Sequence, residues 1–445
     1  MFEKILVANR GEVAVRVIRA CKEMGVKTVA VYSTADAGAF HAQIADEAYC
    51  IGGPRPQESY LNADAILTVA LESGATAIHP GYGFLSESAP FARECRDCGI
   101  VFVGPSPEVI ERMGDKDEAR RTARAAGVPV VEGSDLLRDE ADAQEQARRI
   151  GFPLLVKARA GGGGRGIRKV TGPEGVASAF LAASSEAQAA FGDGGCYMER
   201  FIHPAHHVEV QVLADARGNV VSLGERECSV QRHNQKLLEE SPSPSVTPEV
   251  RERMHAAARD LARAVGYVGV GTIEYLCSDD GTFAFMEMNT RLQVEHPVTE
   301  MVTGVDLVKW QLRVASGVEL PFSQDDVRVD GHAIECRINA ETPEFLPSCG
   351  TVSMLHVPGG PWVRFDTALF QGASVPPYYD SMLGKLVISS PSREEAIRKM
   401  RSALGELVIE GVAENSELQL DILSNPEFVS GVYHTDLMEH LYGDE

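Results

Sequence analysis

Apolar positions in the first hundred or so residues alternate between two spacings. Short apolar runs predict strands at KILVA, KTVAVYS, TAIHP and IVFVG. Between the first two runs, Val13, Val17 and Cys21 recur at helical spacing, and ADAILTVALES predicts another helix. Strands that alternate with helices in this way form βαβ units, so this part of the chain predicts a parallel, doubly wound sheet.

The pattern changes beyond Pro105 and Pro107. DKDEARRTARAAG predicts a charged helix, and a smaller α/β unit follows, with strands expected at PVVEG, PLLVKA, IRKV and CYMER. From Val208 onward, apolar and polar residues alternate, with Glu209 and Gln211 between valines, which predicts antiparallel strands. GHAIECRIN then opens a last α+β segment that runs to the C-terminus.

Length and charge limit the classes of protein to consider. A chain of 445 residues exceeds one ordinary core and predicts two or three domains. The net charge of −22 argues against a nucleic-acid or membrane partner, although an anionic substrate can still bind in a local basic pocket. No signal-peptide pattern or membrane span is recognisable, so we expect a cytoplasmic protein. Cys95 and Cys98 have no second pair to complete a zinc site, and we interpret them as an ordinary helix end in preference to a redox pair.

Two glutamates are expected to face each other in the segment GTIEYLCSDDGTFAFMEMN. Asp280-Gly281 between two apolar runs is a strong signal for a two-residue hairpin turn. If these residues form the turn, Asp279 pairs with Thr282. Counting outward from that pair places Glu274 directly opposite Glu287.

Such a pair of carboxylates has a consequence for the hairpin. Directly opposed like charges are destabilising, and a divalent cation bound between them would reverse the sign. Oxygen ligands suit Mg²⁺, with Mn²⁺ as the alternative, and Asn289 lies on the same strand face as Glu287 and adds a third oxygen. A solvated surface hairpin with a different register is the competing interpretation, and this segment alone leaves both open.

The residues from Gly161 to Gly166 read GGGGRG, which satisfies the spacing G-x-G-x-x-G. A dinucleotide fingerprint requires a helix to open there, whereas the next residues, IRKV, favour a strand. We therefore expect a strand–loop–strand hairpin whose backbone N–H groups form a flap over nucleotide phosphates. Lys157 interrupts the apolar run PLLVKA, and a lysine on a buried strand is costly unless an anion compensates it.

Several segments together resemble the biotin carboxylase family of ATP-grasp enzymes, over the whole chain. They are GGGGRGIR, MERF, HHVEVQVLAD, ECSVQRHNQKLLEESPS, EMNTRLQVEHPVTE, GHAIECRINAE and PPYYDSMLGKL. The resemblance implies a Rossmann-like domain over 1–114, an ATP-grasp domain over 115–330 with a mobile glycine-rich lid at about 130–203, and an α+β C-terminal domain over 331–445. It implies that MgATP, bicarbonate and carrier-linked biotin give carboxybiotin, ADP and phosphate.

The same resemblance assigns roles to individual residues. The implied nucleotide-contacting residues are Lys116, Lys157, Gly162, Gly163, Gly164, Gly166, Glu199, Arg200, Ile202, His207, Gln231 and Asn234. The implied metal ligands are Glu274, Glu287 and Asn289. The implied bicarbonate and biotin contacts are Lys236, Arg291, Gln293, Val294, Arg337 and Tyr82. Lys236, Arg291, Glu295 and Arg337 are the implied catalytic residues, with Glu295 as general base and Arg337 stabilising the enolate-like oxygen of biotin.

Structural alternatives exist for three of these residues. His207 would be a strand histidine satisfied by solvent, and Glu295 a surface carboxylate paired with a neighbouring cation. Arg337 would be held in a structural salt bridge, with Asp380 of YYDSM as a candidate partner. Each alternative makes a contact that a structure can test.

Some positions depart from the family's common pattern. RHNQK places His233 and Asn234 where many relatives have two arginines or Arg-His, which bears on the outer contacts to bicarbonate and phosphate. Arg159 and Ala160 stand where small residues are common, which bears on the motion of the lid. Arg200 follows Glu199 where the family often has lysine, a change expected to be tolerated because the adenine contact is largely through the backbone.

Partners and competing functions follow from the same comparison. The chain has no A-M-K-M biotinylation motif, so the resemblance implies a biotin carboxyl carrier protein and a carboxyltransferase on separate chains. A homodimer is expected, with Arg19, Glu23 and Arg364 as candidate contacts. Another ATP-grasp ligase would lack a reason for RLQVEHPVTE, and a non-catalytic nucleotide sensor would have lost Glu295, Lys236 or a metal ligand.

Overall fold

The first part of the chain folds as the predicted parallel sheet. The computed structural model describes residues 1–159 and 166–443. A five-stranded parallel sheet has the order β3-β2-β1-β4-β5. Its strands are β1 (Lys4–Val7), β2 (Lys27–Tyr32), β3 (Glu47–Cys50), β4 (Ala77–His79) and β5 (Val101–Phe102). The prediction of a doubly wound parallel sheet is confirmed, and β3 is an edge strand that the apolar pattern did not single out.

Helices cover this sheet, and its strand order creates a crevice. The helices are α1 (Gly11–Glu23), α2 (Phe40–Ile44), α3 (Ala63–Ser73), α4 (Ala89–Asp97) and α5 (Pro107–Gly114). The strand order reverses between β1 and β4, and ligands of such sheets bind beyond the carboxyl ends of the strands at that point. There, Asn9 donates hydrogen bonds to the carbonyls of Pro80 (2.7 Å) and Tyr82 (2.8 Å), which ties the two loops together.

The second and largest sheet joins the middle of the chain to its C-terminal part. Eight strands have the order β13-β12-β9-β10-β11-β14-β19-β17. They are β9 (His206–Ala214), β10 (Val220–Arg232), β11 (Gln235–Ser241), β12 (Gly269–Cys277), β13 (Phe283–Asn289), β14 (His332–Asn339), β17 (Val363–Thr367) and β19 (Met382–Ser390). Because β11 pairs with β14, from Leu238 opposite Cys336 to Ser241 opposite Ala333, the last α+β segment continues the central sheet.

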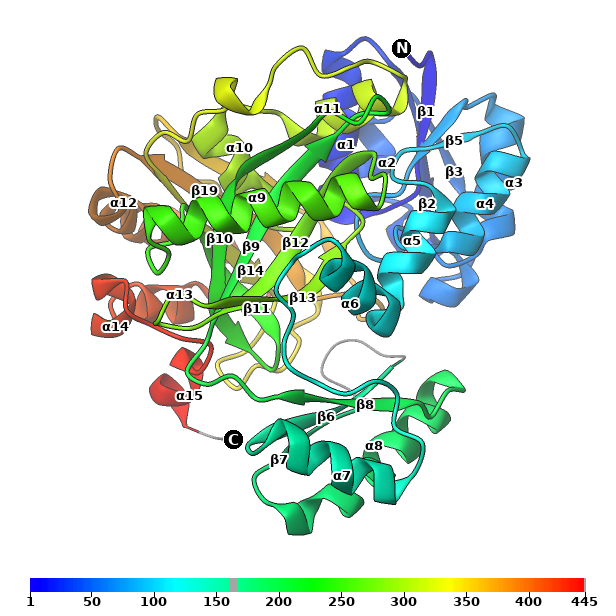
Figure 1. Cartoon of the computed structure of the whole chain (residues 1–445). Coiled ribbons are helices and arrows are strands. Elements are labelled where there is room, and N and C mark those ends of the chain that lie inside the picture. Colours follow the sequence, from blue (N-terminus) through cyan, green and yellow to red (C-terminus); the bar gives the residue numbers. More distant parts are fainter. Residues whose placement is uncertain (160–165, 444–445) are drawn as a thin grey trace.

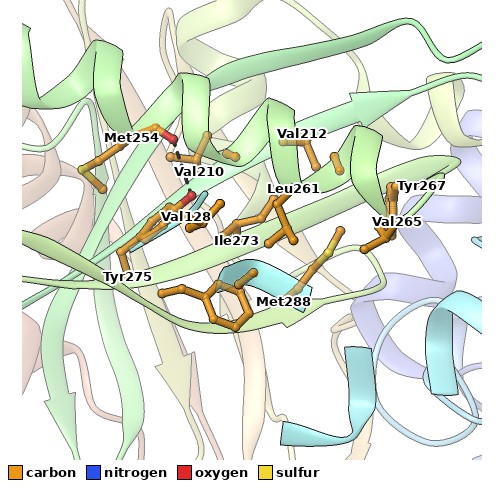
Figure 2. Close-up of a cluster of buried hydrophobic side chains, with 14 of the residues drawn as sticks. Val128, Val210, Val212, Met254, Leu261, Val265, Tyr267, Ile273, Tyr275 and Met288 are labelled. Carbon is orange, nitrogen blue, oxygen red and sulfur yellow. Dashed lines mark hydrogen bonds between the residues drawn. The ribbon is translucent and has the colours of Figure 1, made fainter. Parts of the chain in front are cut away.

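The two faces of β9 have different chemistry, as its alternating pattern predicted. Val208, Val210 and Val212 pack beneath helix α9 (Pro248–Ala264), which crosses one face of the sheet (Figures 1 and 2). The intervening Glu209 and Gln211 are also fully buried, on the opposite face of the strand. The helix therefore covers an apolar face, while the other face of the same strand supplies polar groups.

The lid is a separate small unit below the large sheet in Figure 1. Its sheet has the order β7-β6-β8. Its elements are β6 (Leu154–Ala158), β7 (Ile167–Val170), β8 (Cys196–Arg200), α7 (Glu140–Ile150) and α8 (Val176–Phe191). Antiparallel pairing of Lys157 with Ile167 confirms the strand–loop–strand prediction around the glycine run.

The expected strand at PVVEG does not form. Its backbone makes isolated bridges to two different sheets, Val130 to Phe285 and Gly133 to Glu199. A segment shared between two sheets cannot pair along either for several residues, so this part of the prediction is wrong. Helix α6 (Lys116–Ala125) precedes the segment, as the charged pattern predicted.

The β12–β13 hairpin keeps the predicted glutamate pair but has a different turn. The Ser278 N–H donates to Thr282 O (2.9 Å), so three residues form the loop, and Gly281 adopts φ of 78°. The expected pairing of Asp279 with Thr282 is therefore wrong. The longer loop moves the strand pairing by one residue, and a register shift between Tyr275 and Glu274 moves it back. Glu274 therefore still lies opposite Glu287.

The remaining helices and short strands all follow β13 in the chain. They are α10 (His296–Thr303), α11 (Leu307–Ala315), α12 (Arg393–Glu406), α13 (Ser416–Ile422), α14 (Pro426–Ser430), α15 (Leu437–Tyr442), and the short strands β15 (Gly350–Thr351), β16 (Met354–His356), β18 (Ser374–Val375) and β20 (Val408–Glu410). Single turns of 3₁₀-helix occur at Thr34–Asp36, Pro56–Glu58, Pro173–Gly175 and Gln324–Asp326. Among the described residues, none of the helices has the length and apolar character that crossing a membrane requires.

The core beneath α9 generates a stability prediction. Leu261 is fully buried between this helix and the sheet (Figure 2). Leu261→Ala should lower the free energy of unfolding by about 2–5 kcal/mol, because it removes apolar contacts and leaves a cavity. Urea unfolding followed by circular dichroism measures this. Leu71 on α3 is 55% exposed, and Leu71→Ala should change stability by less than about 0.5 kcal/mol. Equal losses in the two variants would contradict this account of the core.

Candidate active site

One large pocket gathers nearly all of the predicted site residues. It has a volume of about 1670 Å³. It is lined by Tyr82, Lys116, Lys157, Glu199, Arg200, Ile202, His207, Gln231, Asn234, Lys236, Glu274, Glu287, Asn289, Arg291, Gln293, Val294, Glu295 and Arg337. These residues come from the N-terminal sheet, the lid and both parts of the large sheet, so only the tertiary fold brings them together.

Of the predicted glycines, the structure describes only Gly166, which does not line this pocket. Gly162, Gly163 and Gly164 lie outside the described residues. Gly166 begins the return of the lid hairpin, where its carbonyl accepts from the Ala158 N–H (2.9 Å). Its φ is +73°, and a Cβ there would lie 2.8 Å from the Ala158 Cβ, so the position requires glycine for backbone reasons.

Glu274 is the most heavily contacted carboxylate of the pocket. Its Oε1 accepts hydrogen bonds from Asn289 Nδ2 (2.7 Å), Gln293 Nε2 (2.6 Å) and Lys236 Nζ (3.2 Å). Its Oε2 lies 2.8 Å from His207 Nε2. Burial raises the pKa of Glu274, but the charges of Lys236 and His207 outweigh it and hold the pKa well below its usual value.

Glu287 experiences the repulsion that the sequence predicted. Burial raises the pKa of Glu287, and the Glu274 carboxylate opposite raises it further. Asn289 follows two residues later on the same strand, with its Oδ1 accepting from Arg291 Nη2 (2.9 Å). Two opposed carboxylates and an amide oxygen are a donor set that fits Mg²⁺ or Mn²⁺, and a cation between the carboxylates would remove the repulsion. The alternative of a solvated hairpin is wrong for Glu274, which is 4% exposed.

His207 and Lys157 have protein partners in place of solvent. His207 is buried, so its interpretation as a solvent-satisfied strand histidine is wrong. Burial lowers the pKa of His207, but Glu274 raises it above the usual value. Lys157 Nζ donates to Glu199 Oε2 (2.5 Å), so the anion that compensates the buried lysine is a protein carboxylate. The other oxygen of this carboxylate, Glu199 Oε1, lies 3.4 Å from Arg120 Nε.

Lys236 lies at the centre of the pocket among three carboxylates. Its Nζ is 2.7 Å from Glu209 Oε2, 2.6 Å from Glu295 Oε1 and 3.2 Å from Glu274 Oε1. It follows a tight turn at His233-Asn234, whose φ values of 50° and 62° are those of a two-residue hairpin turn. The two departures from the family pattern therefore shape the turn that presents Lys236.

Glu295 is held by two cations. Its Oε1 pairs with Lys236, and its Oε2 accepts from Arg337 Nη2 (3.0 Å). Burial raises the pKa of Glu295, but Lys236, Arg337 and Arg226 outweigh it and lower the pKa far below the usual value. Glu295 is 2% exposed, so the interpretation as a surface carboxylate is wrong. The pairing with neighbouring cations that this interpretation included does occur.

Arg337 is paired with residues other than the one expected. Its Nε donates to Glu239 Oε1 (2.6 Å), and Glu295 accepts from its Nη2. The suggested salt bridge with Asp380 does not form. Burial lowers the pKa of Arg337, but Glu239 and Glu295 raise it above the usual value, so the guanidinium stays charged.

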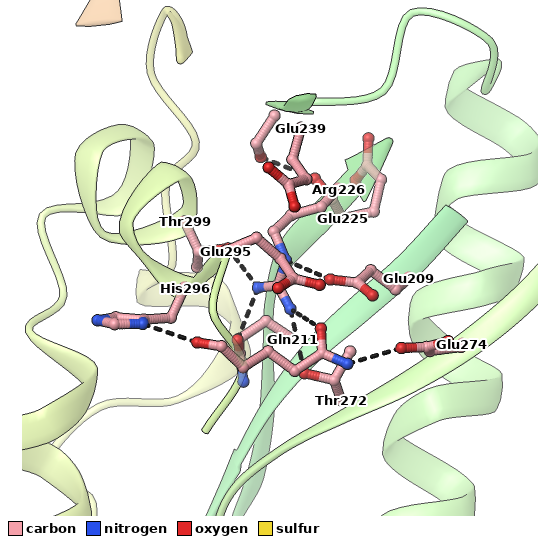
Figure 3. Close-up of polar contacts among 12 residues, drawn as sticks. Glu209, Gln211, Glu225, Arg226, Glu239, Thr272, Glu274, Glu295, His296 and Thr299 are labelled. Carbon is pink, nitrogen blue, oxygen red and sulfur yellow. Dashed lines mark hydrogen bonds and ion pairs between the residues drawn. The ribbon is translucent and has the colours of Figure 1, made fainter. Parts of the chain in front are cut away.

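Arg226 is a central residue that sequence reasoning missed. Its side chain is fully buried (Figure 3). Its Nε donates to Glu209 Oε1 (2.5 Å), its Nη1 to Gln211 Oε1 (2.7 Å) and Thr299 Oγ1 (2.9 Å), and its Nη2 to Thr272 Oγ1 (3.1 Å). The alternation of Glu209 and Gln211 with valines on a buried strand was the available signal, because such polar groups need a buried partner.

Two further contacts connect the site to the N-terminal sheet. Glu87 accepts from Arg291 Nε (2.8 Å) and from the Thr290 N–H (3.1 Å). Its place in GFLSES gave no spacing that could have linked it to Arg291, some two hundred residues later. The contact orients Arg291 at the edge of the pocket.

A second set of contacts fixes Tyr82 and Val294. The Tyr82 hydroxyl donates to the Glu12 carboxylate. Lys385, which is fully buried, lies 3.1 Å from Glu12 Oε1 and donates to the Val294 carbonyl (2.8 Å). This lysine fixes the peptide that joins Val294 to Glu295, and so connects the tyrosine to the proposed base.

Three family models match successive parts of the chain. The model "Biotin carboxylase, N-terminal domain" matches residues 1–110, "Carbamoyl-phosphate synthase L chain, ATP binding domain" matches 115–323, and "Biotin carboxylase C-terminal domain" matches 335–440. Together these matches cover most of the chain.

Individual relatives match along almost their entire length. The biotin carboxylase of Nostoc sp. is 52% identical over 443 residues, which is 99% of each chain. A crystal structure of biotin carboxylase from Campylobacter jejuni has a TM-score of 0.97 at 47% identity, covering 99% of each chain. The biotin carboxylase domain dimer of Hydrogenobacter thermophilus 2-oxoglutarate carboxylase, with MgADP, ADP and bicarbonate, has a TM-score of 0.96 at 50% identity, covering 100% of this chain and 99% of that one. On its sequence, its fold and the chemistry of its pocket, the chain belongs to the biotin carboxylase family.

Proposed function

We propose that the polar pocket binds MgATP and bicarbonate side by side and carboxylates biotin through Glu295, Lys236, Arg291 and Arg337. The activity itself follows from family membership: the protein is an ATP-grasp ligase that joins bicarbonate to biotin at the expense of ATP. The observation that carries the residue roles is the position of Lys236, whose Nζ contacts both Glu274 of the carboxylate pair and Glu295. One side chain, that of Lys236, thus contacts both a proposed metal ligand and the proposed general base.

The nucleotide end of the pocket is rich in groups suited to a triphosphate. Lys116 and Lys157 both line the pocket, and Lys116 is the first residue of α6. Such cations offset the charge that builds up on phosphate oxygens during phosphoryl transfer. We assign the adenine end to Glu199, Arg200 and Ile202, which join the lid to the large sheet.

Glu274, Glu287 and Asn289 would hold the divalent cation, which supplies charge neutralisation at the phosphates. The raised pKa of Glu287 supports this assignment, because an unneutralised second carboxylate is unfavourable beside the first. His207 keeps Glu274 oriented through the hydrogen bond to its Oε2. Gln231 and Asn234 line the adjoining wall.

Glu295 needs a change in its surroundings before it can accept a proton. In the structure, Lys236 and Arg337 lower its pKa, which makes the carboxylate a weak base. A bicarbonate anion bound among Lys236, Arg291 and Gln293 would share those cations and thereby raise the pKa of Glu295. Deprotonated bicarbonate could then attack the γ-phosphorus of ATP, and the carboxyphosphate formed would give CO₂ and phosphate.

Arg337 would act in the second half of the reaction. The released phosphate can take the ureido proton of biotin, which leaves negative charge on the ureido oxygen. The guanidinium, with its raised pKa, remains a cation and can stabilise that charge. Tyr82 lies on the same side of the pocket and is assigned a position near the biotin ring.

The wider organisation comprises the domains, the partners and the location of the protein. We propose the domain division 1–114, 115–330 and 331–445, with the lid at about 130–203. A separate carrier protein, a separate carboxyltransferase and a cytoplasmic location stay predictions. A homodimer is supported by the dimer of the Hydrogenobacter thermophilus domain. Of its suggested contacts, Glu23 pairs with Lys309 and Arg364 with Glu300 and Asp366 within this chain.

The first prediction concerns the overall reaction. ATP hydrolysis should depend on bicarbonate and should be stimulated by free biotin, because bicarbonate must be phosphorylated before CO₂ can be transferred. Phosphate release from the purified chain, with and without each substrate, measures this. Folded protein whose ATPase activity does not respond to biotin would contradict the proposed reaction.

The second prediction tests the base. Glu295→Gln should lower turnover by about 10²–10⁴, the usual contribution of a general base, while the affinity for MgATP stays nearly unchanged. Steady-state kinetics and nucleotide titration measure the two quantities. A comparable loss of MgATP affinity would instead assign Glu295 to nucleotide binding. The matched variant Glu287→Gln should raise the concentration of Mg²⁺ needed for half-maximal activity.

The third prediction separates two roles of Arg337. Arg337→Ala should reduce biotin carboxylation by about 10²–10³, the typical cost of removing one well-placed charge donor. Bicarbonate-dependent hydrolysis of ATP without biotin should fall much less, because the guanidinium acts on the biotin oxygen. Parallel assays of carboxybiotin and phosphate measure the ratio. Equal losses in both assays would make Arg337 a structural partner of Glu239 and Glu295.

A further inference from the structure

A cluster of two histidines and an aspartate lies outside the pocket, at the base of the lid. His206 is the first residue of β9, Asp279 lies in the β12–β13 loop, and His434 lies in the segment before α15. His206 Nε2 is 3.1 Å from Asp279 Oδ1, and His434 Nε2 is 2.9 Å from the same oxygen. Three segments that are distant in sequence thus direct one ligand atom each toward a common point.

The spacing of these three atoms fits a small metal ion. All three lie within 4.8 Å of one another, and the centroids of the two imidazole rings are 4.5 Å apart. A tetrahedral ion with bonds of about 2.0–2.1 Å holds neighbouring ligand atoms roughly 3.3 Å apart. The two nitrogen–oxygen separations, 3.1 Å and 2.9 Å, are close to that value.

Burial and the surroundings of His206 support a ligand role. His206 is 5% exposed, and its other ring nitrogen, Nδ1, lies 3.8 Å from Glu227 Oε1. Glu227 is itself buried and accepts hydrogen bonds from Ser243 (2.6 Å) and Ser245 (2.6 Å). At 3.8 Å the two atoms are too far apart for a hydrogen bond, so the Glu227 carboxylate can favour a metal-bound imidazole only through its negative charge.

The types of ligand identify the class of ion. Mg²⁺ and Ca²⁺ prefer oxygen ligands, whereas two imidazoles and one carboxylate suit a divalent first-row metal such as Zn²⁺. The Asp279 side chain is 62% exposed and lines a pocket of about 490 Å³ with residues 200–204, which leaves room for a water ligand. This chemistry differs from that of the proposed ligands Glu274, Glu287 and Asn289.

We propose that His206, Asp279 and His434 form a binding site for a zinc-type divalent metal that fastens the C-terminal segment to the base of the lid. The Thr435 N–H already donates to the Ala205 carbonyl (3.0 Å), so the segment lies against the connection between β8 and β9. A bound ion adds ligands on both sides of that contact. It joins three segments whose ends are free to separate in the unfolded chain, and it therefore stabilises the folded state.

Metal titration of the full-length protein tests the site. The protein is stripped with a chelator and then titrated with Zn²⁺ by calorimetry, and with Co²⁺ by visible absorption, in excess Mg²⁺ to occupy the oxygen-ligand site. One equivalent of each metal should bind, and Co²⁺ should give the absorption of a site with nitrogen ligands. Absence of binding in excess Mg²⁺ would overturn the proposal.

Variants separate this site from the histidine and carboxylates of the active-site pocket. Asp279→Asn and His434→Gln should each weaken Zn²⁺ binding by roughly tenfold or more, because each removes or weakens one ligand. His356→Gln is the matched control, since His356 is an exposed histidine that pairs with Glu406 (3.2 Å) elsewhere on the surface. Binding that is equally strong in all three variants would place the metal at another site.

Thermal unfolding gives a second readout that does not depend on activity. Zn²⁺ should raise the Tm of the unmodified protein and of His356→Gln, and should raise it less in the other two variants. Circular dichroism without metal checks that each variant is folded, which is expected because Asp279 is in an exposed loop. A Tm increase that is the same in all four proteins would also overturn the proposal.

Discussion

The arrangement of the active site depends on the buried guanidinium of Arg226. A buried cation is costly unless its hydrogen-bonding groups all find partners, and removing one partner of such a pair typically costs about 3–5 kcal/mol. Arg226 is satisfied by Glu209, Gln211, Thr272 and Thr299, which come from strands β9 and β12 and helix α10 (Figure 3). Glu209 in turn pairs with Lys236. The reacting groups are therefore built on a charge network that fixes the strands relative to one another.

Competition for cations sets the chemical state of this network. Lys236 is shared by three carboxylates, and Arg337 by two. Burial raises the pKa of Glu239 to about 6 although Arg337 lowers it, whereas the pKa of Glu295 is held far below its usual value. In the proposed reaction, bicarbonate would compete for the same cations and would thereby make Glu295 a stronger base. At the opposed carboxylates Glu274 and Glu287 the excess charge is negative, so an added cation would relieve the repulsion between them.

The continuous eight-stranded sheet explains how distant segments contribute to one pocket. Strand β14 carries Arg337 and pairs with β11, which carries Lys236. Strands β12 and β13, with the paired glutamates, lie at the other end of the same sheet. The lid contributes Lys157 and Glu199 from below (Figure 1). Long side chains reach across this sheet, so that Lys236 on β11 contacts both Glu209 on β9 and Glu274 on β12.

The sequence determined much of this protein because its signals are local. The strand and helix periodicities predicted the parallel sheet, the lid hairpin and the alternating faces of β9. The family motifs predicted residues that line the pocket, with Gly166 as the exception among the described residues. The opposition of Glu274 and Glu287 was also predicted. The prediction assumed a two-residue turn, and it holds because the three-residue turn and the bulge beyond Tyr275 shift the strand pairing in opposite directions.

Tertiary structure decided what depends on contacts between distant segments. PVVEG failed to become a strand because two sheets compete for its backbone. Arg337 pairs with Glu239 and Glu295 instead of Asp380, and Arg226, Glu87 and Lys385 gained their roles from partners that no sequence spacing relates to them. Local periodicity specifies how each segment folds, whereas the partner of a buried charge is chosen by three-dimensional proximity. That proximity exists only once the sheets have assembled.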